Sequence, residues 1–172
     1  MPEPPSPAVL PWWVLPKRLA GFHKPTAEEL TVLKANGISA IVSVLSDDSN
    51  LDLYKQNTIP HIWVPILGGT APTLDQLNQI KIFVDSQNSL GNAVVIHCSS
   101  GRRRTGTVLA ALLINQGSSY KQALNTILNA NPAIEMREAQ LNFLQTLSHQ
   151  TLSHQTLSHQ TLSHQTLSQT LS

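Results

Sequence analysis

The chain has 172 residues, and its 11 lysines and arginines nearly balance its 10 aspartates and glutamates, which gives a formal net charge of +1 at pH 7. This length suits one domain with a core, and the near-neutral charge argues against a broad nucleic-acid-binding surface. The single cysteine excludes an internal disulfide and favours a reducing compartment. No apolar run is long enough to span a bilayer, and the first residues lack a signal-peptide pattern. We therefore expect a cytoplasmic protein without a membrane span, and we favour a monomer.

The two ends of the chain differ in composition from its middle. Residues 1–11 contain five prolines and are expected to be flexible. From Thr146 the chain repeats TLSHQ, and a five-residue period matches neither a helix nor a strand, so we predict a disordered tail. Weak metal binding by its evenly spaced histidines is an alternative role, for His149, His154, His159 and His164. We accordingly divide the chain into a flexible segment at 1–11, a domain at 12–147 and a tail at 148–172.

Predicted strands and helices alternate through the middle of the chain. Apolar runs predict strands at 12–15, 18–20, 38–44, 61–65 and 93–96. A capping box at Thr26 and Glu29 opens a helix that ends before Gly37, and further helices are predicted at 73–89, 105–114, 119–129 and 135–146. A polar loop holds Asp47, Asp48 and Asp52, and Gly68 with Gly69 marks a mobile loop. This order predicts an α/β fold with a mostly parallel central sheet flanked by helices, whose functional loop lies at the carboxyl ends of the strands.

The stretch HCSSGRRRTG at 97–106 is the strongest functional signal. It lies between a buried strand and a buried helix, an arrangement in which backbone amides and the helix dipole bind an anion. Gly101 allows the tight path of such a loop. Cys98 can act as a thiolate nucleophile, and Arg104, six residues later, can hold two oxygens of a phosphoryl group as a planar fork. We interpret the stretch as a phosphatase site.

The remaining residues of the stretch fit supporting roles. The Thr105 hydroxyl could bond the cysteine sulfur and stabilise it as a leaving group, and His97 more plausibly orders the loop than transfers protons. The other predicted phosphate-loop residues are Ser99, Ser100, Gly101, Arg102 and Arg103. For Arg102 and Arg103 we slightly favour side chains that point into solvent over side chains that contact a polyanionic substrate. The alternative without a function is that Cys98 is an inert buried thiol beside solvated arginines. The combination of strand, cysteine, glycine, arginine and helix start in one stretch argues against it.

With these residues in place, the sequence resembles the cysteine-dependent protein tyrosine phosphatases, whose signature is close to HCxxGxxRTG. Within them it is most similar to the small atypical dual-specificity phosphatases of the VHZ type. WVLPKRLAG at 13–21, GISAIVSV at 37–44, the helix from 71 and IEMREAQLNFL at 134–144 follow that layout. The resemblance implies the dual-specificity phosphatase fold, a phosphocysteine intermediate and no metal or other cofactor. It maps Cys98 to the nucleophile, Arg104 to the phosphate-binding arginine and Thr105 to the hydroxyl that assists breakdown of the intermediate.

One position departs from the family pattern. Members usually place a general-acid aspartate directly after a Val-Pro or Ile-Pro pair, but here Val64-Pro65 is followed by Ile66, which cannot donate a proton. Three sources of a replacement carboxylate remain, each of which can also be an ordinary helix-cap or loop residue. We rank Glu135 first, ahead of Asp75 and of Asp47 or Asp48. Without an acid, a tyrosine leaving group can still depart as phenolate, whereas an alkyl alcohol needs protonation.

Several functions stay open at this point. The leading hypothesis is a protein phosphatase acting on phosphotyrosine, with phosphoserine and phosphothreonine less favoured, so that the partner is a phosphoprotein or a small phosphorylated substrate. Arg102 and Arg103 fit an alternative substrate such as a phosphoinositide, an inositol phosphate or an RNA 5′-triphosphate. A catalytically weakened phosphate-binding module is the third possibility. A low-molecular-weight phosphatase is disfavoured, because in that family the loop follows the first strand and Cys98 comes late.

Overall fold

The computed structural model describes residues 1–2 and 9–170, with side chains up to residue 154. Five strands form one sheet in the order β1-β2-β5-β3-β4. Only β1 (Trp12–Leu15) is antiparallel to its neighbour, and the parallel strands are β2 (Leu19–Phe22), β5 (Ala93–His97), β3 (Ile38–Ser43) and β4 (His61–Trp63). The expected mostly parallel sheet is therefore confirmed, and β5 is its central strand. Most of the predicted flexible segment at 1–11 lies outside the described residues.

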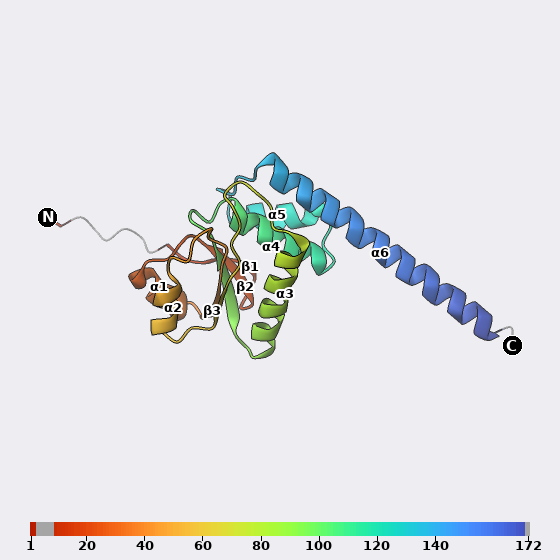
Figure 1. Ribbon diagram of the computed structural model, residues 1–172, viewed down its shortest axis with the longest axis horizontal. Helices are drawn as coiled ribbons and strands as arrows, with labels where there is room; N and C mark the ends of the chain where they lie inside the picture. The colour runs from red at the N-terminus through yellow and green to blue at the C-terminus, as the bar shows by residue number, and fades with distance from the viewer. Residues whose placement is uncertain (3–8, 171–172) are drawn as a thin grey trace.

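Helices cover both faces of the sheet (Figure 1). One face packs against α1 (Ala27–Ala35) and α2 (Leu51–Gln56) around a smaller apolar cluster. The other face packs against a larger apolar cluster. Four helices contribute side chains to it: α3 (Leu74–Ser89), α4 (Arg104–Asn115), α5 (Tyr120–Ala130) and α6 (Glu138–Thr170). Because both faces are covered, the strands read as continuous apolar runs rather than alternating ones.

Three of the helices begin at a reciprocal capping box. In each, a hydroxyl accepts the N–H three residues on, and the side chain there accepts the N–H of the cap residue: Thr26 with Glu29, Thr73 with Gln76, and Ser119 with Gln122. Such pairs satisfy two otherwise free helix amides and fix where the helix starts. The start predicted from Thr26 is confirmed.

Two local expectations differ from the structure. The segment predicted as a polar loop contains α2, because Tyr54 is fully buried under the sheet and anchors one short helical turn there. The last helix, predicted from residue 135, begins at Glu138, and residues 134–137 form an irregular segment that crosses the start of α4. A Cβ on Gly106 would lie 2.9 Å from the Ile134 side chain, so a larger residue there would displace the end of that side chain.

The C-terminal repeat differs from the expected irregular tail, because its backbone continues α6 to Thr170 and projects away from the domain (Figure 1). Among the α6 residues whose side chains the structure describes, which end at residue 154, the last buried ones are Leu147 and Ser148. A five-residue repeat distributes its leucines around a helix, so no apolar stripe continues the packing. Because the packing ends there, we propose that the boundary between the domain and the tail lies near residue 147. Among the described residues, no helix has the length and apolarity needed to cross a membrane.

Candidate functional site

The predicted phosphate loop, residues 98–103, connects the central strand β5 to α4. Every residue of β5 is buried, and so is every residue of α4 from Arg104 to Ile114. The carboxyl ends of β5, β3 and β4 meet at this edge of the sheet, as expected for a parallel arrangement. The loop is therefore held by the core on both sides.

Cys98 lies at the base of this loop and is 1% exposed. The Gly101 backbone N–H donates to its Sγ at 3.2 Å. Gly101 has a φ of +72°, and a Cβ there would lie 2.7 Å from the Phe22 carbonyl oxygen, so both the turn and the close approach to β2 require glycine.

Arg104 is 8% exposed, and its guanidinium is fixed by groups from three segments. Nη1 donates to the Ile66 carbonyl at 2.9 Å, and Nη2 donates to Ser99 Oγ at 3.0 Å. A longer contact of 3.5 Å joins Nη1 to the Val44 carbonyl at the end of β3. Ile66 thus takes part in the site through its backbone, and the guanidinium is oriented before any anion arrives.

His97 belongs to a buried hydrogen-bond chain that ends at the cysteine. Its Nδ1 lies 3.0 Å from the Cys98 carbonyl oxygen and its Nε2 lies 2.7 Å from the Tyr54 hydroxyl. A carbonyl only accepts, so the ring proton is on Nδ1 and the Tyr54 hydroxyl donates to Nε2. Asn50 Nδ2 in turn donates to the Tyr54 oxygen at 3.2 Å. Burial lowers the pKa of His97 to about 4, so the ring is neutral near pH 7.

Tyr54 is the member of this chain that sequence reasoning missed. Its segment looked like a loop, and only the fold brings it next to His97. Burial raises the pKa of its hydroxyl to about 12, so the hydroxyl keeps its proton and can act as a donor. This geometry supports the interpretation that His97 orders the loop, which stays a prediction.

The Thr105 hydroxyl has an unusual position. It is fully buried, and among the described residues it is the one buried side-chain polar atom without a hydrogen-bond partner. The predicted bond to the Cys98 sulfur is thus not made in this structure. Buried polar groups are almost always satisfied, so an orphan at the first turn of α4 fits a group that acts during a reaction.

A cavity of about 380 Å³ opens above the cysteine. Five of the predicted residues line it, namely Cys98, Ser99, Ser100, Arg103 and Arg104, and they are joined by Gly68, Gly69 and Arg137. Arg102 is exposed and outside the lining, whereas Arg103 lines the cavity, so the expectation of two solvent-facing arginines is right only for Arg102. Arg137 was not predicted, although the stretch 134–144 had been noted for its resemblance to the family.

None of the candidate acids lines this cavity. The Glu135 side chain is 69% exposed, and its Oε2 lies 3.7 Å from Arg103 Nη2. Asp75 lies in the exposed first turn of α3, as a helix-start carboxylate does. The hydroxyl and amide of Ser49 hold the pKa of Asp47 below its usual value, with smaller contributions from Lys24 and Arg104. A lowered pKa favours the carboxylate over the acid at Asp47.

The position next to Pro65 also lacks access to the cavity. The Ile66 side chain is 2% exposed and packs in the larger apolar cluster. The cavity wall on this side is formed instead by Gly68 and Gly69, which carry no side chain. Among the described residues that line the cavity, the ionisable groups are one thiol and three guanidiniums, and none is a carboxylate or an imidazole.

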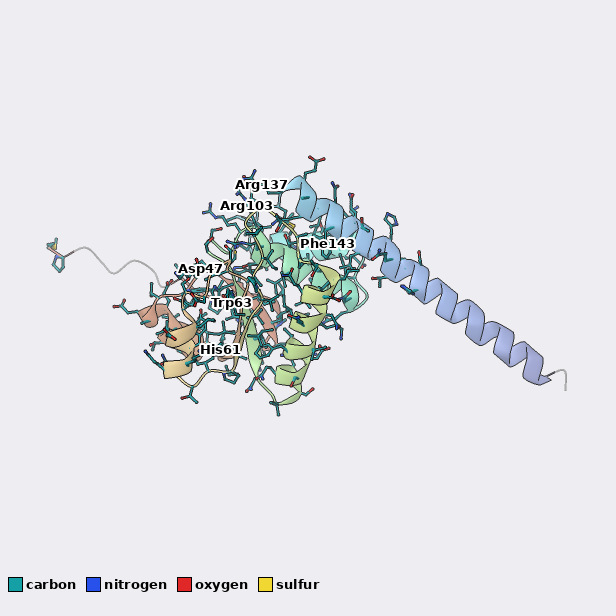
Figure 2. All side chains as sticks on the ribbon, in the orientation of Figure 1. Asp47, His61, Trp63, Arg103, Arg137 and Phe143 are labelled. Carbon is teal, nitrogen blue, oxygen red and sulfur yellow. The ribbon has the colours of Figure 1, made fainter. Side chains whose placement is uncertain are left out.

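Figure 2 separates the candidate groups in space. Arg103 and Arg137 lie beside each other at the end of the domain where α6 begins, and both line the cavity. Asp47 is labelled at a distance from this pair, and His61 and Trp63 lie farther away, along β4. No three histidine, cysteine, aspartate or glutamate side chains gather as a possible metal site among the residues described, which do not include the side chains of His159 and His164.

Known proteins match the chain over the region that builds this site. A family model described as "Tc-R-P: Polymorphic toxin system, DSP-PTPase phosphatase" matches residues 17–118. The human phosphatidylglycerophosphatase and protein-tyrosine phosphatase 1 is 37% identical over 75 residues, which are 43% of this chain and 37% of that protein. Inositol diphosphatase DSP3 of Arabidopsis thaliana is 26% identical over 134 residues, which are 73% of this chain and 63% of that protein. The chain thus spans well under half of the human relative's length.

Solved structures agree with the fold. The crystal structure of Tk-PTP in its active form superposes with a TM-score of 0.74 at 27% identity, covering 81% of this chain and 96% of that one. A kinase-associated phosphatase with serine in place of its catalytic cysteine superposes with a TM-score of 0.75, covering 88% and 99% at 20% identity. The family match, together with these superpositions, places the chain in the DSP-PTPase phosphatase family of the cysteine-dependent protein tyrosine phosphatase superfamily, among its atypical dual-specificity phosphatases.

Proposed function

We propose that this chain hydrolyses phosphate monoesters through a phosphocysteine intermediate on Cys98. The Sγ thiolate attacks phosphorus, an S–P bond forms, and the P–O bond to the leaving group breaks with its electron pair on oxygen. Water then attacks phosphorus, the S–P bond breaks, and thiolate and inorganic phosphate are released with the water's proton. The observation that carries this proposal is the placement of Cys98 Sγ, bonded to the Gly101 amide, in one cavity with the oriented guanidinium of Arg104.

The lack of an acid on the cavity limits the leaving group. A phenolic oxygen has a pKa of about 10 and can depart unprotonated, whereas an alkyl alcohol resembles water, whose pKa is about 15.7. This difference favours phosphotyrosine over phosphoserine and phosphothreonine. We therefore keep phosphotyrosine as the first candidate among protein substrates.

A second candidate substrate is a small molecule with more than one phosphate group. It is favoured by Arg103, which lines the cavity beside Arg104. The names of two relatives, a phosphatidylglycerophosphatase and an inositol diphosphatase, point in the same direction. A phosphoinositide, an inositol phosphate and an RNA 5′-triphosphate all share this chemistry.

The first experiment compares the wild-type chain with Cys98→Ser on p-nitrophenyl phosphate. We expect the serine variant to lose at least about 1,000-fold in kcat, since a hydroxyl is a far weaker nucleophile than a thiolate. It should still bind inorganic phosphate, because the loop amides and Arg104 remain. Acid quenching of the wild type during turnover should trap phosphate on the Cys98 peptide.

Two results would contradict the proposal. A serine variant that kept more than a few per cent of activity would exclude the covalent route. A wild-type chain that bound phosphate but did not turn over the aryl phosphate would be the catalytically weakened module considered above. Arg18→Gln is the matched surface control, because Arg18 is exposed and precedes β2 at the opposite end of the strands from the loop.

A further inference from the structure

The cavity has a rim that hydrolysis of a single phosphate ester leaves unused. Two of its residues are arginines from segments far apart in sequence: Arg103 directly before α4, and Arg137 directly before α6. Figure 2 shows the two next to each other. Neither belongs to the group of atoms that hold Arg104 or Cys98.

Arg137 is held in place by its backbone. Its N–H donates to Gln140 Oε1 at 2.8 Å, and Gln140 Nε2 donates to the Thr70 carbonyl at 3.1 Å. Gln140 is fully buried, so it fixes the start of α6 against the segment that follows the glycine pair. A Cβ on Gly69 would lie 3.8 Å from Arg137 Cγ and 3.9 Å from its Nε, which shows that the Arg137 side chain runs along the Gly69 backbone.

The charged end of Arg137 is left available. Its guanidinium makes no hydrogen bond or ion pair with any residue that the structure describes. The Arg103 guanidinium has one carboxylate nearby, Glu135, at 3.7 Å, which is too long for a hydrogen bond and is largely solvated. Both side chains can therefore donate to an anion in the cavity.

The charge of the cavity exceeds what one phosphoryl group needs. Arg104 and the loop amides match the group under attack, and two further cations line the same 380 Å³ space with no carboxylate on its wall. In an in-line displacement the leaving oxygen lies opposite the attacking sulfur, so the rest of the substrate extends from Cys98 toward the rim. Arg103 and Arg137 thus face the leaving group.

We propose that Arg103 and Arg137 form a subsite for a second phosphate group carried by the substrate. The proposal rests on the proposed function and names its substrate class: molecules with two phosphates close together, joined as an anhydride or placed on neighbouring carbons. For such a substrate the subsite compensates for the missing acid, because guanidiniums bound to the second phosphate stabilise, without a proton, the negative charge that develops next to it. In an anhydride the leaving group is itself a phosphate, whose second pKa of about 6 makes protonation unnecessary.

Binding to the Cys98→Ser protein tests the subsite separately from catalysis. By calorimetry we expect inorganic pyrophosphate or inositol 4,5-bisphosphate to bind about tenfold more tightly than inorganic phosphate, as one added charge-assisted contact allows. Adding Arg137→Gln should remove about tenfold of the affinity for the diphosphorylated probe and less than about twofold for phosphate. Arg18→Gln in the same background should change neither affinity.

The two probes separate the possible sources of the second phosphate. Dependence on Arg137 for pyrophosphate alone supports an anhydride, and dependence for the inositol compound alone supports neighbouring esters. The proposal is overturned if neither probe binds more tightly than phosphate, or if Arg137→Gln weakens phosphate and both probes equally. Retained phosphate affinity in Arg137→Gln shows that the variant is folded.

The same variant separates failure of the subsite from failure of the proposed function. If the wild type does not hydrolyse p-nitrophenyl phosphate, the proposed function fails whatever the binding data show. If it does, Arg137→Gln should lower kcat/KM for the diphosphorylated substrate about tenfold more than it lowers kcat/KM for p-nitrophenyl phosphate. Equal losses on both substrates would show that Arg137 supports the loop rather than a second phosphate.

Discussion

The base and the rim of the cavity are built in different ways. At the base, Cys98 and Arg104 are almost fully buried, lie at the junction of β5 and α4, and have hydrogen-bond partners that fix them. At the rim, Gly69, Arg103 and Arg137 lie in irregular segments, and neither guanidinium makes a hydrogen bond to a residue that the structure describes. The half of the cavity that holds the transferred phosphoryl group is therefore part of the core. The half that meets the leaving group lies in the irregular segments outside it.

The largest effect is expected at Arg104, where chemistry and packing coincide. Arg104→Lys should lower kcat/KM for p-nitrophenyl phosphate about 100- to 1,000-fold, nearly as much as Arg104→Ala. A lysine cannot reach the Ile66 carbonyl and Ser99 together while holding two phosphate oxygens. Steady-state kinetics of the two variants make this test, with circular dichroism as the folding control. A lysine variant close to wild type would reduce Arg104 to a general positive charge.

The next effect concerns the absent acid at the rim. Along a series from nitrophenyl to alkyl phosphates, kcat should fall steeply, by at least about 100-fold, since no side chain protonates the leaving oxygen. Alanine variants of Glu135, Asp75 and Asp47 should each change the slope little, because none of the three lines the cavity. A flat series that becomes steep in Glu135→Ala would identify Glu135 as the acid.

The third effect distinguishes the backbone of Ile66 from its side chain. The family pattern has an aspartate here, but the Ile66 side chain points into the apolar core while its carbonyl holds Arg104. Ile66→Asp should therefore lower the free energy of unfolding by roughly 3 kcal/mol or more and restore no activity on alkyl phosphates. Ile66→Val, which keeps an apolar side chain, should cost about 1 kcal/mol. Urea denaturation of both variants measures this, and a stable, acid-competent aspartate variant would disprove it.

These cases show which parts of the molecule sequence reasoning reached. Strand, phosphate loop and helix follow one another within a single motif, so their order and the mostly parallel sheet could be predicted. Tyr54, Arg137 and Gln140 reach the site through packing between distant segments, which no local pattern reports. The sequence also does not show in which direction a side chain points. Ile66 occupies the position after Pro65 where the family pattern has its aspartate, yet the core decides where its side chain points.

A smaller effect is expected from the buried chain behind the base. The pKa of His97 is about 4 in the folded protein and near 6.5 when unfolded, so the unfolded chain binds the extra proton first as the pH falls. The free energy of unfolding should therefore fall by about 2 kcal/mol as the pH is lowered from 7 to 5. His97→Asn should lose that part of the pH dependence. The lowered pKa values of Asp47 and Glu29 act mainly at more acidic pH, and the comparison with His97→Asn separates the contribution of the histidine from theirs.

Urea denaturation at pH 7 and pH 5 provides the measurement. Tyr54→Phe is the companion variant, because it removes the donor to Nε2 and keeps the ring in the core. Burial still lowers the pKa of His97 in this variant, and a buried Nε2–H would have no acceptor, so the variant should keep the pH dependence that His97→Asn loses. A pH dependence unchanged in His97→Asn would show that other groups control stability in this range.

The smallest effect separates two neighbouring arginines of the loop. Arg103 lines the cavity and Arg102 is exposed outside it, although both carry one positive charge next to the same phosphate site. Arg103→Gln should lower kcat/KM for the diphosphorylated substrate a few-fold, and Arg102→Gln should lower it less than about twofold at 0.15 M salt, where exposed charges are screened beyond about 8 Å. Because the two variants have the same net charge, the difference between them measures position rather than charge. If the two losses were equal and disappeared together in higher salt, the rim would act only as a diffuse positive field, and Arg103 would have no direct contact with the substrate.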